Sequence, residues 1–150
     1  MKQFLVLACA ALLAGCATNN ASIQSGQDAA QPQTAVKTLD GTAWMLPIPK
    51  GSSCEVPPML EFEEGTVSGD LGCNRITARY SLKADGSFAF SDVKRGKRTC
   101  GPEFMALEAR MVKIVENAAS IRRTQKTLDF LDRNGKIIET LVPEKAGACE

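Results

Sequence analysis

Alternation of apolar and polar residues in several short stretches between residues 59 and 141 constrains the fold of this chain more than any other feature. A period of two is typical of β-strands that bury one face. It predicts strands over residues 59–63, 66–69, 73–82, 88–90, 128–131 and 136–141. Residues 41–46, which contain the only tryptophan, Trp44, are expected to form a first strand. Asp85-Gly86 is a strong signal for a tight hairpin between two of them. The chain is therefore predicted to be mostly antiparallel sheet.

One segment has a different period. From Glu103 onward, apolar residues recur at steps of three and four, which predicts an amphipathic helix that ends near Asn117. Pro102 fits the first turn of this helix, where its missing N–H has little cost. The apolar positions are Phe104, Leu107, Met111, Ile114, Val115 and Ala118. One helix packed against a mostly antiparallel sheet is an α+β architecture.

The amino-terminal segment is predicted to direct export. Lys2 precedes an uncharged run from Phe4 to Leu13, which is the layout of a secretory signal and is too short for a transmembrane helix of about 20 residues. The tetrad Leu13-Ala14-Gly15-Cys16 resembles the bacterial lipobox, whose cysteine thiol receives a diacylglycerol before the signal is removed. We therefore expect a lipoprotein signal peptide over residues 1–15 and a lipid anchor on Cys16.

Residues 16–37 are predicted to be the lipidated cysteine and a flexible tether. They contain almost no large apolar side chain, so the segment cannot bury enough surface to offset its ordering entropy. A flexible chain of some 20 residues spans on the order of 25 Å. The folded domain is then expected over residues 38–150.

Charge and composition argue against nucleic-acid binding and against most catalysis. Cleavage removes Lys2 and no acid from a chain of formal charge +1, which leaves a neutral protein with 5% aromatic residues. The chain has no histidine, the usual general base near neutral pH and a frequent zinc ligand. We therefore expect no catalytic residue, no metal and no cofactor. An enzyme with a lysine or carboxylate base is the less favoured alternative.

Four cysteines remain once the signal is removed and Cys16 is lipidated. They are Cys54, Cys73, Cys100 and Cys149. In an exported, oxidising compartment an even number of cysteines indicates disulfides, and four cysteines allow three pairings. Zinc binding is the alternative, but no two of the four have the C-x-x-C spacing.

A set of short motifs runs through the predicted elements. These are Trp44, Leu60-Glu61-Phe62, Val67-Ser68-Gly69, Gly72-Cys73-Asn74, Tyr80, Thr99-Cys100, Glu108, Leu128 and Gly135. Over about residues 38–142 the chain resembles the META domain, the module of HslJ-like heat-inducible lipoproteins. The resemblance implies a curved antiparallel sheet, or partial barrel, with one helix that fills its open side. It also implies an exported lipoprotein with a role in stress tolerance or antibiotic resistance.

The resemblance further implies that Cys73 pairs with Cys100. Cys54 and Cys149 would then form a second disulfide with each other. A redox-active pair is the alternative, and the absence of a C-x-x-C motif argues against it.

Glu108 stands at the edge of the apolar stripe of the predicted helix, where a carboxylate would be partly buried and would need a partner. Asn74 and Arg75 are the nearest candidates, because the disulfide that the resemblance implies joins their strand to the start of the helix. We predict that these three residues form a polar clasp between helix and sheet. The alternative is a ligand-facing acid in a pocket.

Lys94, Arg95, Lys97 and Arg98 form a strongly basic stretch around Gly96, in a loop or at a strand end. Such a stretch is commonly a solvated surface. Beside a membrane, however, it would bind anionic lipid, lipopolysaccharide phosphates or an acidic envelope protein.

These features together predict a lipid-anchored, non-enzymatic envelope protein that contributes to envelope integrity through binding or assembly. Ala17 stands where an aspartate commonly signals retention at the inner membrane, so we expect the periplasmic face of the outer membrane. The main alternative is a protein inhibitor of a hydrolase such as lysozyme.

Overall fold

The computed structural model describes residues 38–47 and 57–144 of the chain. Within them lie β1 (Thr42–Met45), β2 (Met59–Glu63), β3 (Thr66–Asp70), β4 (Arg75–Leu82), β5 (Phe88–Arg95), α1 (Pro102–Asn117), β6 (Ser120–Arg123), β7 (Leu128–Leu131) and β8 (Ile137–Pro143). The strands form one antiparallel sheet in the order β5-β4-β3-β2-β1-β8-β7-β6. The predicted α+β architecture is confirmed, although β6 was not predicted. The predicted signal peptide, Cys16, the predicted tether, Cys54 and Cys149 lie outside the described residues.

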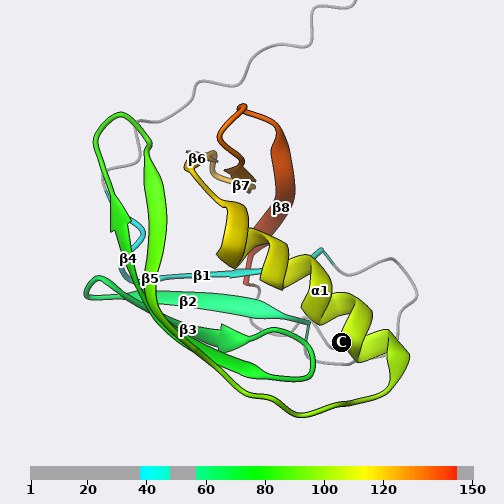
Figure 1. Cartoon of the computed structure of the whole chain (residues 1–150). Coiled ribbons are helices and arrows are strands. Elements are labelled where there is room, and N and C mark those ends of the chain that lie inside the picture. Colours follow the sequence, from blue (N-terminus) through cyan, green and yellow to red (C-terminus); the bar gives the residue numbers. More distant parts are fainter. Residues whose placement is uncertain (1–37, 48–56, 145–150) are drawn as a thin grey trace, which may run out of the picture.

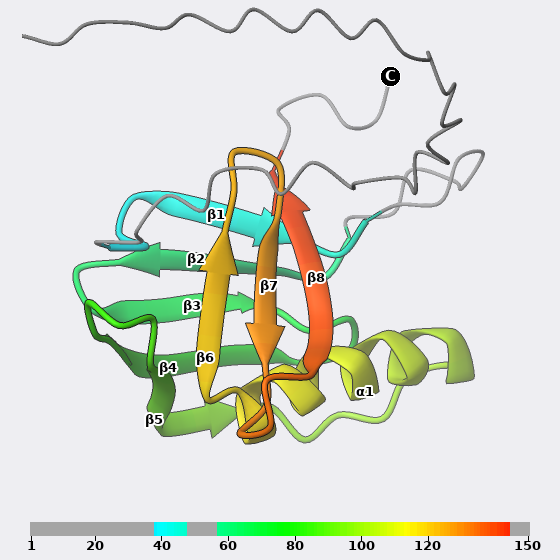
Figure 2. The same ribbon diagram turned by 90° about the horizontal axis from the view of Figure 1, so that it is seen from above.

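The sheet curls into a half-barrel. Its two parts meet where β1 pairs with β8 at Trp44 and Met45 only, and Figure 2 shows β6–β8 running across β1–β5. At the far edges, Ser87 bridges to Ser120, and the Phe88 amide donates to the carbonyl of Ala119 at 2.9 Å. The sheet therefore almost closes at the start of β5.

An aromatic cluster fills the interior at this nearly closed side. Its centre is Phe88, which is 3% exposed and lies 4.8–6.5 Å, between ring centroids, from four other rings. These rings belong to Phe62, Tyr80, Phe90 and Phe130. Aromatic pairs at such distances contribute about 0.5–1.5 kcal/mol each beyond the burial of their surface.

Helix α1 lies across the open side of the half-barrel (Figure 1). Met111 and Ile114 are fully buried, and Arg110 donates from Nε to Glu139 of β8 at 2.8 Å. The first turns of the helix approach the backbone at Gly72, whose φ is +121°. A Cβ at this position would lie 2.8 Å from the carbonyl oxygen of Phe104, so only glycine permits this close packing.

A β-bulge on β5 determines which side chains face the helix. The register runs Tyr80↔Phe90 and Arg79↔Ser91 before the bulge, and Thr77↔Lys94 and Ile76↔Arg95 after it. Asp92, in the bulge, has a φ of +51°, a left-handed conformation that aspartate tolerates better than most residues. Because opposite residues of an antiparallel pair share a face, Arg95 lies on the same face as the buried Ile76.

Candidate functional site

A polar cluster joins α1 to the sheet, and we define it as Asn74, Arg95, Arg98 and Glu108. Glu108 is 3% exposed and Asn74 is 2% exposed. Asn74 donates from Nδ2 to Glu108 Oε2 at 2.9 Å and to Oε1 at 3.2 Å. Arg95 donates from Nη1 to Glu108 Oε1 at 3.1 Å. The buried carboxylate is thus paired with one cation and hydrogen-bonded to one amide, as a buried charge requires.

Asn74 also holds the loop that follows β5. Its Nδ2 donates to the carbonyl of Arg98 at 2.9 Å, and its Oδ1 accepts from the Arg98 amide at 2.8 Å. The Arg98 side chain donates a hydrogen bond from Nη2 to the carbonyl oxygen of Cys73 at 2.7 Å. Throughout the part of the chain that the structure describes, every buried side-chain nitrogen and oxygen has a hydrogen-bond partner.

A disulfide reinforces the same junction. Cys73 and Cys100 are bonded, with their Cα atoms 5.7 Å apart. The bond joins the residue before Asn74 to the loop that leads into α1. This is the pairing that the family resemblance implied.

The prediction that Arg75 is a partner of Glu108 is wrong. Ile76 faces the core, so Arg75, its neighbour on the strand, projects to the opposite side and is exposed. Arg95 forms the ion pair instead, because the bulge on β5 brings it onto the helix-facing side of the sheet.

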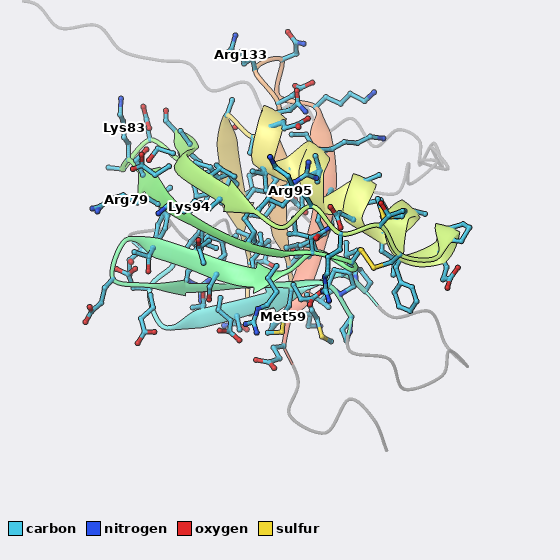
Figure 3. All side chains as sticks on the ribbon, turned by 60° about the horizontal axis from the view of Figure 1, so that its bottom comes forward. Met59, Arg79, Lys83, Lys94, Arg95 and Arg133 are labelled. Carbon is cyan, nitrogen blue, oxygen red and sulfur yellow. A yellow bond between two sulfur atoms is a disulfide. The ribbon has the colours of Figure 1, made fainter. Side chains whose placement is uncertain are left out.

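The four residues of the basic stretch have different surroundings. Arg95 pairs with Glu108, and Arg98 donates to the carbonyl of Cys73. Lys94 is opposite the exposed Thr77, and in Figure 3 it lies on the side of Arg79, whereas Arg95 lies toward α1. Lys97 is exposed in the loop after the strand. Of the predicted patch, Arg98 is therefore engaged by an internal contact, whereas Lys94, Arg95 and Lys97 contribute to the lining of one groove.

A groove lies beside the polar cluster, between the end of β5 and α1, and its volume is about 710 Å³. Its apolar lining consists of Leu71, Ile76, Val93, Val112 and Val115, and its polar lining consists of Lys94, Arg95, Gly96, Lys97 and Glu116. The sequence pattern did not predict this groove. The sequence shows that the helix has many apolar residues, but it does not indicate the bulge in β5 that leaves a space beside the helix.

The chemistry available to Glu108 is limited by its contacts. Both of its carboxylate oxygens accept hydrogen bonds, and the residue is 3% exposed. A ligand would have to displace Asn74 or Arg95 to reach it. The geometry therefore favours the polar clasp over the ligand-facing acid.

A second polar contact connects the segment before β1 to β4. The Tyr80 hydroxyl donates to Asp40 Oδ1 at 2.5 Å, and the Gly65 amide donates to the same oxygen at 3.0 Å. The hydrogen bond from Tyr80 lowers the pKa of Asp40 below its usual value, and the Gly65 amide adds to this effect. Burial raises the pKa of Tyr80, and the hydrogen bond to Asp40 raises it further.

Within residues 38–47 and 57–144, no group of three or more histidine, cysteine, aspartate or glutamate side chains is arranged to hold a metal ion. None of the helical structure in these ranges is both long and apolar enough to cross a bilayer.

Comparisons with known proteins agree with this architecture. Residues 37–145 match the META domain. The fold is similar to an NMR structure of a protein from Burkholderia xenovorans, with 20% identity, a TM-score of 0.63, and coverage of 83% of this chain and 97% of that chain. A second NMR structure has 21% identity and a TM-score of 0.53, and the match covers 69% of this chain and 90% of the other. Comparison with curated proteins gave no match.

Proposed function

Because the chain belongs to the META domain family, as its motifs predict, and is therefore a bacterial envelope-associated protein, we propose that it is lipid-anchored and acts by binding rather than by catalysis. Its role is to maintain envelope integrity under stress, including exposure to antibiotics. The groove between β5 and α1 is its binding surface.

The groove is the observation that carries this proposal. Binding sites for small ligands are typically concave, mostly apolar and about 300–1,000 Å³ in volume, with a few polar groups that orient the ligand. The volume of about 710 Å³, the five aliphatic residues and the cations at the margin fit this description. Val93 supports it further, because it is 46% exposed, which is a high exposure for a large aliphatic side chain.

Two features of the chain support binding rather than catalysis. The sequence contains no histidine. Both oxygens of the buried acid of the polar cluster already accept hydrogen bonds from Asn74 or Arg95, and the residue is 3% exposed, so it is poorly placed for proton transfer to a substrate.

Anchoring rests on the lipobox-like tetrad that ends at Cys16 and on the tether of residues 16–37. The anchor would keep the groove within the tether's reach, on the order of 25 Å, of the membrane surface. Ala17 supports the periplasmic face of the outer membrane as the location.

Complementation of a deletion strain tests the proposal. The strain would express the wild-type chain, Cys16→Ala, Val93→Glu or Ile137→Glu, and envelope integrity would be measured as uptake of an apolar fluorescent dye after heat shock. Ile137 is the matched control, because it is 44% exposed and lies outside the groove lining. We expect the wild type and Ile137→Glu to restore the barrier and the other two variants to fail. Full rescue by Cys16→Ala contradicts the anchor, and full rescue by Val93→Glu contradicts the groove.

A further inference from the structure

Helix α1 carries more apolar surface than the sheet covers. Met111 and Ile114 are fully buried against the sheet, whereas Val112 and Val115 are only half-buried on the flank that lines the groove. Val93 faces them from β5, and Leu71 and Ile76 complete the lining. No aromatic ring lines the groove, and the side chains of its lining that can form hydrogen bonds are all charged. Such a surface suits a flexible hydrocarbon chain better than a planar or polar ligand.

The two ends of the groove differ in charge. Arg95 marks one end through its contact with Glu108, and its side chain is 43% exposed, so part of its guanidinium meets solvent. Lys97 also lines the groove. Glu116 follows Glu108 by eight residues, which is about 12 Å along a helix. An anionic group is therefore attracted to the end at Arg95 and repelled from the end at Glu116.

An extended peptide added to the edge of β5 fits these observations less well. After the bulge, only Lys94 and Arg95 continue the strand before it ends. A bulge together with lysine and arginine is a common means of preventing a further strand from pairing at a sheet edge.

We propose that the groove binds the acyl chain of an anionic phospholipid, with the headgroup phosphate at Arg95 and Lys97 and the chain along Val93, Val112 and Val115. This inference rests on the proposed function and names the ligand class of the same site. The membrane beside the anchored protein is the source of the lipid.

The test uses the mature chain from residue 16 with Cys16→Ala and with ¹³C-labelled valine methyl groups. It is titrated with lysophosphatidylglycerol below the concentration at which micelles form. Lysophosphatidylcholine with the same acyl chain is the control for headgroup charge. We expect saturable shifts of the Val93, Val112 and Val115 methyl signals with the anionic lipid, and binding about tenfold weaker with the zwitterionic lipid.

Matched variants locate the headgroup. Lys97→Glu is expected to weaken binding of the anionic lipid about tenfold, whereas Lys113→Glu, on the exposed face of α1, leaves it unchanged. Val93→Glu removes binding, and Ile137→Glu retains it. Equal affinity for the two lipids overturns the preference for an anionic headgroup. Absence of shifts at the three valines overturns the inference, as does saturable binding of an extended acidic peptide when neither lipid binds.

Failure of this inference and failure of the proposed function are distinguishable. If neither lipid binds while Val93→Glu still fails to restore the envelope barrier, the groove keeps its function and the lipid assignment is wrong. If the anionic lipid binds as expected while Val93→Glu restores the barrier fully, the lipid site stands and the proposed function is wrong.

Discussion

The two ends of β5 are built by different interactions. At its start, Phe88 is 3% exposed among four aromatic rings, and its amide bonds to the residue before β6. At its end, Arg95 pairs with Glu108 of α1, and a groove separates the strand from the helix. One end of the strand closes the half-barrel, and the other end leaves it open.

The difference follows from the physical nature of the two kinds of contact. Burial of aromatic surface is non-directional and brings elements as close as packing allows. Hydrogen bonds and ion pairs have defined lengths and angles, so they can hold two elements at a fixed separation. The polar cluster therefore fixes α1 over the sheet without closing the space between β5 and the helix flank.

The largest expected effect is at the aromatic end. Phe88→Ala should lower the free energy of unfolding by about 3–5 kcal/mol, because it removes a buried ring and leaves a cavity. Urea unfolding monitored by the fluorescence of Trp44, the only tryptophan, measures it. Phe88→Leu is the control and should have a clearly smaller cost. A cost below about 1 kcal/mol for Phe88→Ala would mean that this end of the strand is not a packed core.

Loss of the Cys73–Cys100 disulfide, at the open end, is expected to have the second-largest effect on the free energy of unfolding. Replacement of both Cys73 and Cys100 by serine removes a link between residues 27 apart in sequence. Loss of this constraint on the unfolded chain predicts a cost of about 3.6 kcal/mol. The same urea assay measures it, and an unchanged unfolding midpoint would show that the polar cluster alone secures the junction.

Arg95 and Lys94 should differ in their effects, although they are neighbours in sequence. Arg95→Ala is expected to cost about 1–2 kcal/mol, because it leaves Glu108 without its cation; the exposure of Arg95 keeps the effect modest. Lys94→Ala, on the other face of the strand, should lie within about 0.5 kcal/mol of the wild type. Thermal unfolding compares the two. Equal costs in stability would mean that the bulge does not determine which side chains of β5 point toward α1.

The smallest effect concerns the contact between Tyr80 and Asp40, and its signature is pH dependence. Tyr80 is the only tyrosine, so its absorbance titration reads a single group, and the midpoint should lie above the usual pKa of 10.0. Asp40→Asn should move the midpoint down toward that value. A midpoint at or below 10.0 in the wild type would show that the hydroxyl is neither buried nor bonded.

The same contact should affect stability at both extremes of pH. The pKa of Asp40 is lowered in the folded protein. Its contribution to the stability of the fold is therefore present above pH 3.8, and it is lost as the pH falls through the folded pKa. The pKa of Tyr80 is raised in the folded protein. Its contribution to the stability of the fold is therefore complete below pH 10.0, and it is lost as the pH rises through the folded pKa. Tyr80→Phe should reduce both dependences in melting experiments.

Local sequence patterns predicted most of the fold. The strands 59–63 and 73–82 and the helix after Pro102 have clear periodicity, and the structure places strands and a helix there. The short strand β6, Ser120–Arg123, was missed because only Ile121 in it is buried, so it has no apolar alternation to recognise. Its strand conformation depends on pairing with β7.

The site was predictable only in part. The position of Glu108 in the helix stripe and the closeness of Asn74 were anticipated, since both depend on local periodicity and on the motif that contains Cys73. Arg95 was not anticipated as the partner of Glu108. The bulge adds one residue to β5, so every side chain after it points to the opposite face of the sheet from the one that simple alternation predicts. The left-handed conformation of Asp92 has no distinctive sequence signal, so the groove beside the bulge was equally hidden.

The role of the polar cluster as a clasp is tested most directly by the coupling free energy between Asn74 and Glu108. Urea unfolding of Asn74→Ala, Glu108→Ala and the double variant gives this quantity. Because the side chains are bonded at 2.9 Å and both are buried, we predict a coupling of at least about 1 kcal/mol. Additive costs, within about 0.3 kcal/mol, would contradict the clasp.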